Sequence, residues 1–332
     1  MMEPDTDHQL RSLSIRAMNT HIEVLCRTDA ETMNLVQETA DDWFAQVEER
    51  FSRFLPESEL QFLNLQAGEH CLVSDVMFEV LQLAEAYRQQ TNGAFHPLLL
   101  HPLERLGYNV SFERLRERTE YRVPPAQDAV QPSAGIELNT VMKSARLPRG
   151  TRLDLGGIVK GWAAGKLAGY LRDRLEIGAG VVNVGGDLAS WCPSEDEGEP
   201  WFIGIENPWE PHRDTGVLAL RSGAAATSST LGRSWTTDRG IMHHLIDPRT
   251  GMSAASRVVQ CTVAGPDAAA CEAWSKALCV LGLTEGLQLM RTRTRQYEAV
   301  IFTEDRHIIG FGDSSSFGDR WLHIPIDKFE SR

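Results

Sequence analysis

The segment from Leu153 to Leu171, LDLGGIVKGWAAGKLAGYL, places the strongest constraint on how this chain folds. We expect Asp154 to end a strand, and the pair Gly156 and Gly157 allows a tight backbone turn after it. A helix should follow, with Lys160 near its start. Free backbone N–H groups at a helix start, together with a lysine, suit a phosphate group. A Gly-Gly turn before a helix is equally compatible with a purely structural role.

Helices and strands alternate along the chain without a strict strand–helix–strand rhythm, which favours a single α+β domain. Strand patterns are expected at about 11–27, 181–184, 201–206, 217–222, 257–264, 297–303 and 307–311. Helical spacing of apolar residues is expected at about 30–54, 74–93, 160–175 and 267–281. We place the domain at residues 11–325, with tails at 1–10 and 326–332.

The charge of the chain restricts its partners. Its 33 Lys and Arg residues stand against 46 Asp and Glu residues, a net charge of -13 with His neutral. Such an acidic chain argues against non-specific binding to nucleic acid or to anionic lipid. The charge does not argue against a small anionic ligand, because one local basic residue is enough to hold a phosphate.

The N-terminus, the apolar runs and the cysteine spacing together indicate where the protein is located. The N-terminus, MMEPDTDHQLRS, lacks the apolar region of a signal peptide, and no apolar run reaches the roughly 18 residues that a membrane helix needs. The six cysteines include no C-x-x-C pair and read as small core residues. We therefore expect a cytoplasmic protein with no membrane span.

Six segments follow one another in an order that is typical of one family. They are AMNTHIEV (17–24), the Leu153–Leu171 segment, VVNVGGDL (181–188), AATSST (225–230), HHLIDPRTGMSA (243–254) and ALCVLG (277–282). Together they resemble the FAD:protein FMN transferase family, the ApbE-like proteins. The resemblance covers about residues 13–311 and implies an ApbE-like α+β fold, with an FAD cleft between sheet and helical regions.

The resemblance also implies a reaction. FAD is split at its pyrophosphate, FMN is joined to a Thr or Ser hydroxyl of an acceptor protein, and AMP leaves. A Mg²⁺ ion would bridge the pyrophosphate oxygens. Two alternatives stay open. One is a protein of the same family that binds FAD but has lost the transferase activity, and the other is an enzyme that only hydrolyses FAD to FMN and AMP.

Carried over position by position, the resemblance assigns catalytic roles to Asp154, Lys160 and His244. It assigns FAD contacts to these three and to Met18, Thr20, Phe95, His96, Gly185, Gly186, Asp187 and Thr227, and metal ligation to Gly157 and Glu272. Simpler roles fit several of them. Asp154 and Asp187 also suit turn caps, and His244 also suits a strand residue bonded to backbone.

The sequence departs from the family pattern at the metal ligands. Where the family helix usually has Asp and, four residues later, Thr, this chain has Glu272 and Lys276. A charged ammonium has no lone pair to give a metal ion. The pair either forms an ordinary helical ion pair, worth about 0.3–0.5 kcal/mol, or Lys276 takes the metal position and offsets pyrophosphate charge.

Two further departures lie in other motifs. The family's "GaFDp" segment reads GAFHP here, so that His96 stands in place of Asp. Its "TSG" segment reads Thr227-Ser228-Ser229, which replaces a permissive Gly with Ser229. Neither change excludes FAD binding.

Overall fold

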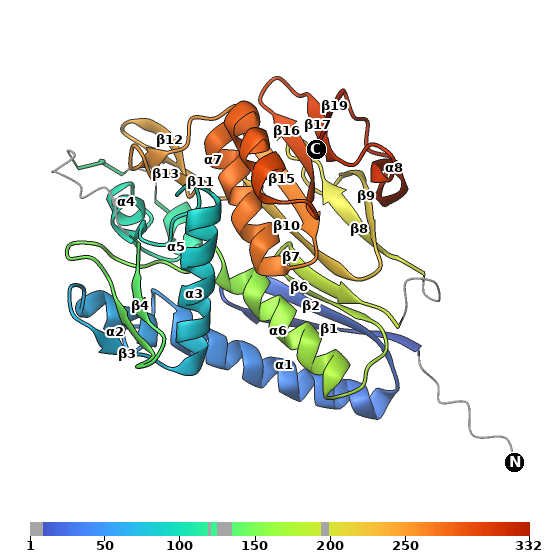
Figure 1. Cartoon of the computed structure of the whole chain (residues 1–332), viewed down its shortest axis with the longest axis horizontal. Coiled ribbons are helices and arrows are strands. Elements are labelled where there is room, and N and C mark those ends of the chain that lie inside the picture. The colour runs from blue at the N-terminus through green and yellow to red at the C-terminus, as the bar shows by residue number, and fades with distance from the viewer. Residues whose placement is uncertain (1–8, 119–120, 125–134, 194–198) are drawn as a thin grey trace, which may run out of the picture.

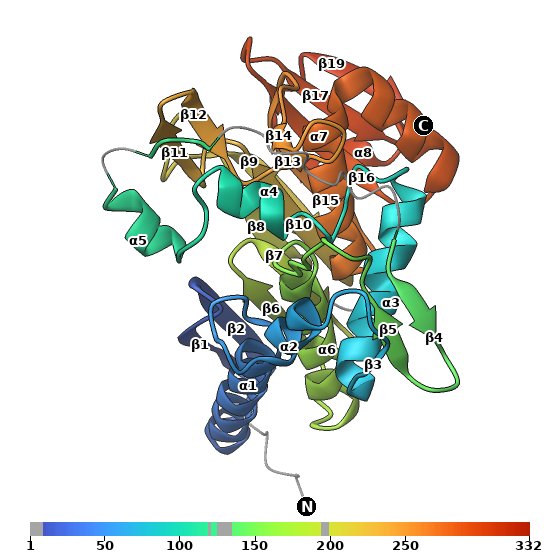
Figure 2. The same cartoon turned by 90° about the vertical axis from the view of Figure 1, so that its left-hand side faces the viewer.

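The computed structural model describes residues 9–118, 121–124, 135–193 and 199–332 of the chain (Figures 1 and 2). The helices are α1 (Ala30–Phe51), α2 (Glu59–Leu65), α3 (Asp75–Gln90), α4 (Leu100–Arg105), α5 (Phe112–Arg116), α6 (Val159–Asp173), α7 (Ala268–Arg293) and α8 (Phe317–Arg320). None of these helices combines the length and the apolar character that crossing a membrane requires. The α+β class expected from the sequence is confirmed.

A nine-stranded sheet runs through the molecule in the order β1-β2-β6-β7-β10-β15-β16-β17-β19. Its strands are β1 (Gln9–Ala17), β2 (Thr20–Thr28), β6 (Gly180–Val184), β7 (Asp187–Trp191), β10 (Gly223–Ser229), β15 (Val258–Gly265), β16 (Glu298–Thr303), β17 (Ile308–Gly312) and β19 (Lys328–Ser331). Neighbours are antiparallel except β17 and β19, which run parallel. Residues 328–331, which the sequence analysis places in a tail, therefore belong to the sheet.

Four smaller sheets surround this central one. The β18-β9-β8 sheet consists of β8 (Trp201–Glu206), β9 (Asp214–Leu220) and β18 (Trp321–Leu322). The β3-β5-β4 sheet consists of β3 (Cys71–Leu72), β4 (Glu137–Asn139) and β5 (Ser144–Arg146). The other two are the pair β11 (Ser234–Thr237) and β12 (Gly240–His243) and the pair β13 (Ile246–Asp247) and β14 (Met252–Ser253). Helices α4 and α5 and the β11–β12 hairpin gather at one end of the molecule (Figures 1 and 2).

The central sheet is buried on both faces from β6 to β17, which makes a three-layer arrangement, whereas β1 and β2 leave one face exposed. Helices α1, α3, α6 and α7 cover one face (Figure 1). The β18-β9-β8 sheet packs against the other face. Side chains alternate between the two layers as the strand pleat requires: Val182 faces the helices, whereas Val181 faces the small sheet. Consecutive buried apolar residues such as those at 299–302 on β16 are explained by this double burial.

Most elements match the sequence pattern, and the differences have local reasons. The alternation over 11–27 belongs to two strands, because Met18 and Asn19 form a turn with φ of 52° and 56°. Such a pair of positive φ values is typical of a two-residue hairpin. Ser74 caps α3 as expected, accepting a hydrogen bond from the Met77 N–H. In α7, Gly282 takes φ 76° and ψ -177°, so that two helices meet there.

The strand expected to end at Asp154 does not form. Residues 151–155 have no regular secondary structure, and the Asp154 N–H donates to the Pro97 carbonyl instead of to a strand neighbour. Asp154 Oδ1 accepts the Gly156 N–H at 2.9 Å. Asp154 therefore caps the turn that leads into α6, the structural role that the sequence also allowed.

Helices α6 and α7 approach each other most closely at Gly161. A Cβ atom on Gly161 would lie 2.5 Å from the backbone oxygen of Ala268 and 3.0 Å from the backbone nitrogen of Ala269. Backbone cannot move aside as a side chain can, so a larger residue here would force the two helices apart.

We predict that Gly161→Ala lowers the free energy of unfolding by about 1–3 kcal/mol, the usual cost of overpacking a core. Gly165→Ala is the matched control, because Gly165 lies one turn later on the exposed face and a Cβ there meets nothing within 4 Å. Helix propensity should make the control slightly more stable. Urea unfolding followed by circular dichroism measures both, and equal stability of the two variants would contradict the close contact.

Candidate active site

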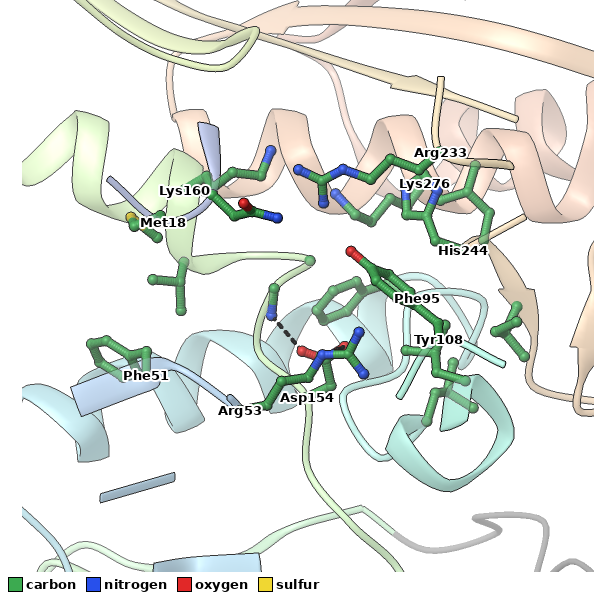
Figure 3. Close-up of a pocket in the computed structure, with 18 of the residues that line it drawn as sticks. Met18, Phe51, Arg53, Phe95, Tyr108, Asp154, Lys160, Arg233, His244 and Lys276 are labelled. Carbon is green, nitrogen blue, oxygen red and sulfur yellow. Dashed lines mark hydrogen bonds and ion pairs between the residues drawn. The ribbon is translucent and has the colours of Figure 1, made fainter. Parts of the chain in front are cut away.

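A mainly apolar cavity, hereafter the ring cavity, opens between the C-terminal end of α1, the 94–108 segment and the start of α6. Its walls include Met18, Phe51, Arg53, Phe54, Phe95, His96, Leu103, Tyr108, Asp154, Gly157, Val159, Leu245 and Val280. Phe51, Phe95 and Tyr108 give it an aromatic lining (Figure 3). An aromatic-lined hollow with a few polar groups is suited to a flat ring system.

A second hollow, hereafter the polar hollow, adjoins the ring cavity on the side of the β6–β7 turn. It is lined by backbone and small polar side chains, among them Asn183, Gly185, Gly186, Thr227, Ser228, Ser229, Gln260 and Thr262. The two hollows share Gly156, Lys160, Arg233, His244 and Lys276. Three cationic side chains therefore stand at the junction of the two hollows, and Figure 3 shows them pointing toward one another.

Lys160 is held at this junction by a buried carboxylate. Its Nζ donates to Asp187 Oδ2 and lies 3.7 Å from Glu272 Oε1. Burial lowers the pKa of the Lys160 ammonium, but the attraction of Asp187 and Glu272 outweighs burial and leaves the pKa above its usual value. Lys160 therefore stays charged. The other oxygen of Asp187, Oδ1, has no hydrogen-bond partner among the described residues.

Glu272 is the most deeply buried acid of the site, with no exposed surface. Its Oε2 accepts the Gly161 N–H at 2.9 Å, and its Oε1 accepts from Lys276 Nζ at 3.0 Å. Burial raises the pKa of Glu272, but Lys276 and Lys160 outweigh it, and the net pKa is lowered. The pair with Lys276 is thus a buried ion pair at the start of α6, and not the solvated helical pair that the sequence allowed.

These contacts use backbone N–H groups at the start of α6 that the sequence analysis expected to be free for a phosphate. The Gly161 N–H, in the first turn of α6, is already taken by Glu272, and the Val159 N–H donates to the Leu155 carbonyl at 3.1 Å. These two backbone groups are not free to bind a phosphate. Side-chain cations, and not the helix N-terminus alone, supply the positive charge here.

His244 lies just beyond β12 and lines both hollows. Burial lowers its pKa well below the usual value, and the positive charges of Arg233 and Lys276 lower it further. The imidazole is therefore neutral near pH 7. Its Nδ1 is buried without a hydrogen-bond partner among the described residues. A neutral imidazole with an unused ring nitrogen can accept or donate a proton when a substrate group arrives.

Arg53 and Asp154 line the ring cavity on the side across from the three cations of the junction (Figure 3). Only 7% of the Arg53 side chain is exposed, and its Nε lies 4.0 Å from Asp154 Oδ2. The guanidinium stacks on Tyr108 and Phe54, with its carbon 4.3 Å and 4.6 Å from their ring centroids. Its Nη1 is buried and has no hydrogen-bond partner among the described residues. A buried donor beside a cavity is a candidate ligand contact.

The structure brings most of the sequence-predicted residues to these two hollows. Met18, Phe95, His96, Asp154, Gly157, Lys160, Gly185, Gly186, Thr227 and His244 line one or both. Three do not. Asp187 and Glu272 lie behind the wall as partners of the lysines. Thr20 packs against Gly185, where a Cβ would come within 2.1 Å of its Oγ1. Thr20 is therefore a packing residue of the turn.

The two minor departures from the family pattern are accommodated locally. The Leu98 N–H donates to His96 Nδ1 at 3.2 Å, which is the turn-capping bond that an Asp side chain also makes. Ser229 lies on β10 and is absent from the residues with positive φ, so that its backbone does not need glycine. Neither change strains the site.

Sequence reasoning missed three residues of the site, namely Arg53, Tyr108 and Arg233. Each follows a segment whose pattern was read for secondary structure alone. Arg53 comes directly after the amphipathic helix α1, and Arg233 lies in a loop just before β11. A polar residue beside a helix end or in a loop gives no periodic signal, so that only the tertiary arrangement identifies it.

The comparisons with known proteins assign the chain to a family. The sequence pattern of the ApbE family matches residues 18–301, which is most of the chain. The protein therefore belongs to the ApbE family, as the resemblance in the sequence predicted.

Relatives and solved structures agree with this assignment. A Klebsiella pneumoniae (strain 342) protein named FAD:protein FMN transferase is 29% identical over 261 residues, covering 76% of this chain and 77% of its own. A Treponema pallidum protein of the same name is 27% identical over 257 residues, covering 71% and 68%. The ApbE protein from Thermotoga maritima superposes with a TM-score of 0.79 at 24% identity, over 90% of this chain and 96% of that one. The flavin transferase ApbE from Vibrio cholerae gives a TM-score of 0.75 at 22% identity, over 94% and 100%. These two structures establish the ApbE fold.

The neutral state of His244 predicts a pH dependence of stability. Because its pKa is lowered in the folded chain, protons bind the unfolded chain first as the pH falls below about 6.5. The free energy of unfolding should then fall toward pH 5, with His244 contributing up to about 1.4 kcal/mol per pH unit. His244→Asn should flatten this slope, whereas His212→Asn controls for losing an exposed histidine. Urea unfolding at several pH values measures both, and an unchanged slope in His244→Asn would contradict the neutral state.

Proposed function

We propose that this protein transfers FMN from FAD to a Thr or Ser hydroxyl of an acceptor protein and releases AMP. One observation carries the proposal: a ring cavity and a polar hollow meet at Lys160, Arg233 and Lys276. FAD has the complementary shape, with ring systems at its ends and two phosphates in the middle. The names of the curated relatives, FAD:protein FMN transferase, support the same activity.

Binding follows from the lining of the two hollows. The aromatic side chains of the ring cavity provide flat apolar surfaces for one ring system. The small polar groups of the polar hollow suit a ribose or a second ring. Charge at the junction then fixes how FAD lies along the two hollows. The pyrophosphate is the only strongly charged part of FAD, so that it should lie beside the cations of the junction.

The proposed reaction breaks the phosphoanhydride bond of FAD. The acceptor hydroxyl oxygen forms a bond to the FMN phosphorus, and the AMP phosphate leaves with the electron pair of the broken bond. In this proposal the neutral imidazole of His244, which lines both hollows, accepts the hydroxyl proton. Lys160 and Arg233 offset the charge that gathers on the phosphate oxygens, which is the main task of a phosphoryl-transfer site. Asp154 holds the Gly156 turn that carries Lys160 into place.

A second function also has an observation behind it. The Glu272–Lys276 pair stands where the resemblance implies metal ligands, and phosphoryl transfer commonly relies on a metal ion to neutralise the developing charge. A protein that binds FAD without transferring FMN is therefore the alternative. The assay below separates the two, and it also detects an enzyme that only hydrolyses FAD.

We predict that the purified protein, mixed with FAD and an acceptor of a known flavin transferase, releases AMP and adds FMN to the acceptor in equal amounts. Mass spectrometry of the acceptor and chromatography of AMP measure the two products. His244→Asn should lower the rate about 10²-fold or more while FAD binding persists. AMP without modified acceptor would indicate hydrolysis. Bound FAD with neither product would favour the binding protein.

We also predict that Arg53→Met weakens FAD binding about tenfold or more, because a charged donor to a ligand is worth some 1.5–3 kcal/mol. Stability should change by only about 1 kcal/mol, since the ion pair with Asp154 is long, at 4.0 Å, and a methionine side chain keeps apolar contact with the neighbouring rings. Arg50→Met is the control, because Arg50 pairs with Glu59 at 2.9 Å and lines neither hollow. Flavin fluorescence titration measures the affinities. Equal loss in both variants would contradict a contact between Arg53 and FAD.

A further inference from the structure

Lys276 lies between the two residues to which the family resemblance assigns the metal ion. Its Nζ is 3.0 Å from Glu272 Oε1, and its stem packs on Gly157, where an added Cβ would lie 3.2 Å from Lys276 Cε. Only 16% of the Lys276 side chain is exposed. The ammonium is thus fixed in place at the junction of the two hollows and is not a free surface lysine.

The residues around Lys276 do not fit a Mg²⁺ ion. Both Glu272 oxygens already accept hydrogen bonds, one from the Gly161 N–H and one from Lys276. No group of three or more His, Cys, Asp or Glu side chains in the described part of the chain could hold a metal. Mg²⁺ requires near-octahedral oxygen ligands at about 2.0–2.1 Å. A divalent ion on Glu272 Oε1 would also meet the repulsion of the adjacent Lys276 ammonium.

Ser275, the remaining oxygen donor on this face of α7, is also engaged. Its hydroxyl forms a 2.7 Å hydrogen bond with Ser228 and also lies 3.0 Å from the Glu272 carbonyl. Ser275 is fully buried and lines neither hollow, because it lies behind Ser228 of the polar hollow. The helix face that would have carried a metal site is therefore satisfied by protein groups alone.

The charges at the junction favour an anion of the size of a pyrophosphate. The ammonium groups of Lys160 and Lys276 balance the carboxylates of Asp187 and Glu272. Arg233 forms no ion pair with any residue that the structure describes, so that the junction keeps an excess of positive charge. An ammonium group has three donors, and Lys276 uses one of them on Glu272. The other two remain for phosphate oxygens.

We propose that the Lys276 ammonium replaces the divalent metal ion in this chain, and that Lys276 and Arg233 together bind the FAD pyrophosphate without Mg²⁺. The proposal rests on the proposed function, because it takes the pyrophosphate of FAD as the ligand. Lys276 and Arg233 carry the same total positive charge as one Mg²⁺ ion. They supply that charge through directed hydrogen bonds instead of inner-sphere coordination.

The test compares FAD affinity in EDTA and in saturating Mg²⁺, by quenching of flavin fluorescence. The parent protein should bind FAD with affinities that agree within about twofold, a difference of less than 0.5 kcal/mol. A second measurement uses Mn²⁺, a paramagnetic ion with the same ligand preference as Mg²⁺. Electron paramagnetic resonance of added Mn²⁺ should show no binding to the parent protein, with or without FAD.

Two variants link this behaviour to Lys276. Glu272→Gln/Lys276→Gln removes the ammonium together with the buried carboxylate that pairs with it, whereas Lys276→Thr alone would leave that carboxylate with only the 3.7 Å ion pair to Lys160. It should weaken FAD binding in EDTA about tenfold or more, the usual worth of a charge-assisted hydrogen bond. Glu272→Asp/Lys276→Thr restores the family residues and should make FAD binding depend on Mg²⁺. Glu79→Gln/Lys166→Gln is the control, since this 2.6 Å ion pair lies outside both hollows.

The outcomes separate this inference from the proposed function. If the parent protein needs Mg²⁺ to bind FAD, or if it binds Mn²⁺, then Lys276 does not replace the metal ion. That outcome would leave the proposed function intact. Unchanged FAD affinity in Glu272→Gln/Lys276→Gln would also overturn the replacement of the metal ion by Lys276. Failure of the parent protein to bind FAD in either medium would contradict the proposed function, and the inference with it.

Discussion

The buried carboxylate of Glu272 is the interaction on which the rest of the site depends. It joins α7 to the first turn of α6 through the Gly161 N–H, and it pairs with Lys276 and lies near Lys160. Burying a charge is costly unless hydrogen bonds and opposite charges surround it. Lys276 stands on α7 beside Glu272, but the Gly161 N–H and Lys160 belong to α6 and reach Glu272 only when the two helices meet at Gly161. Helix packing and the placement of Lys160 are therefore one requirement.

The sheet explains why the remaining residues meet at the same place. The β1–β2 turn carries Met18, and the β6–β7 turn carries Gly185 and Gly186. These turns are neighbours because β2 pairs with β6, with Ile22 opposite Val184. Met18 lines the ring cavity, whereas Gly185 and Gly186 line the polar hollow. The pairing of β2 with β6 thus holds one edge of both hollows in place.

The departures from the family pattern differ in their consequences. His96 and Ser229 are accommodated by local hydrogen bonding and by an ordinary backbone conformation. Lys276 is different, because it changes the charge and the chemistry of the position itself. A cation that is part of the chain cannot dissociate, whereas a metal ion exchanges with solvent. Glu272 and Asp187 pair with Lys276 and Lys160, and Arg233 supplies the positive charge that remains for an anion.

The sequence alone determined the α+β class, most helices and strands, and the family, and it predicted Lys160, Asp154 and His244, which the structure places around the ring cavity. Periodicity and local motifs carry that information, because burial on one face of a helix or strand repeats at a fixed spacing. The sequence also singled out Lys276 as a departure, but left its role open between a surface ion pair and a replacement for a metal. Only the tertiary structure decided that the pair is buried, that Glu272 accepts the Gly161 N–H of α6, and that Arg53 and Arg233 line the same cavity as Lys160. Burial and the approach of segments far apart in the chain set these features, and neither has a local signature in the sequence.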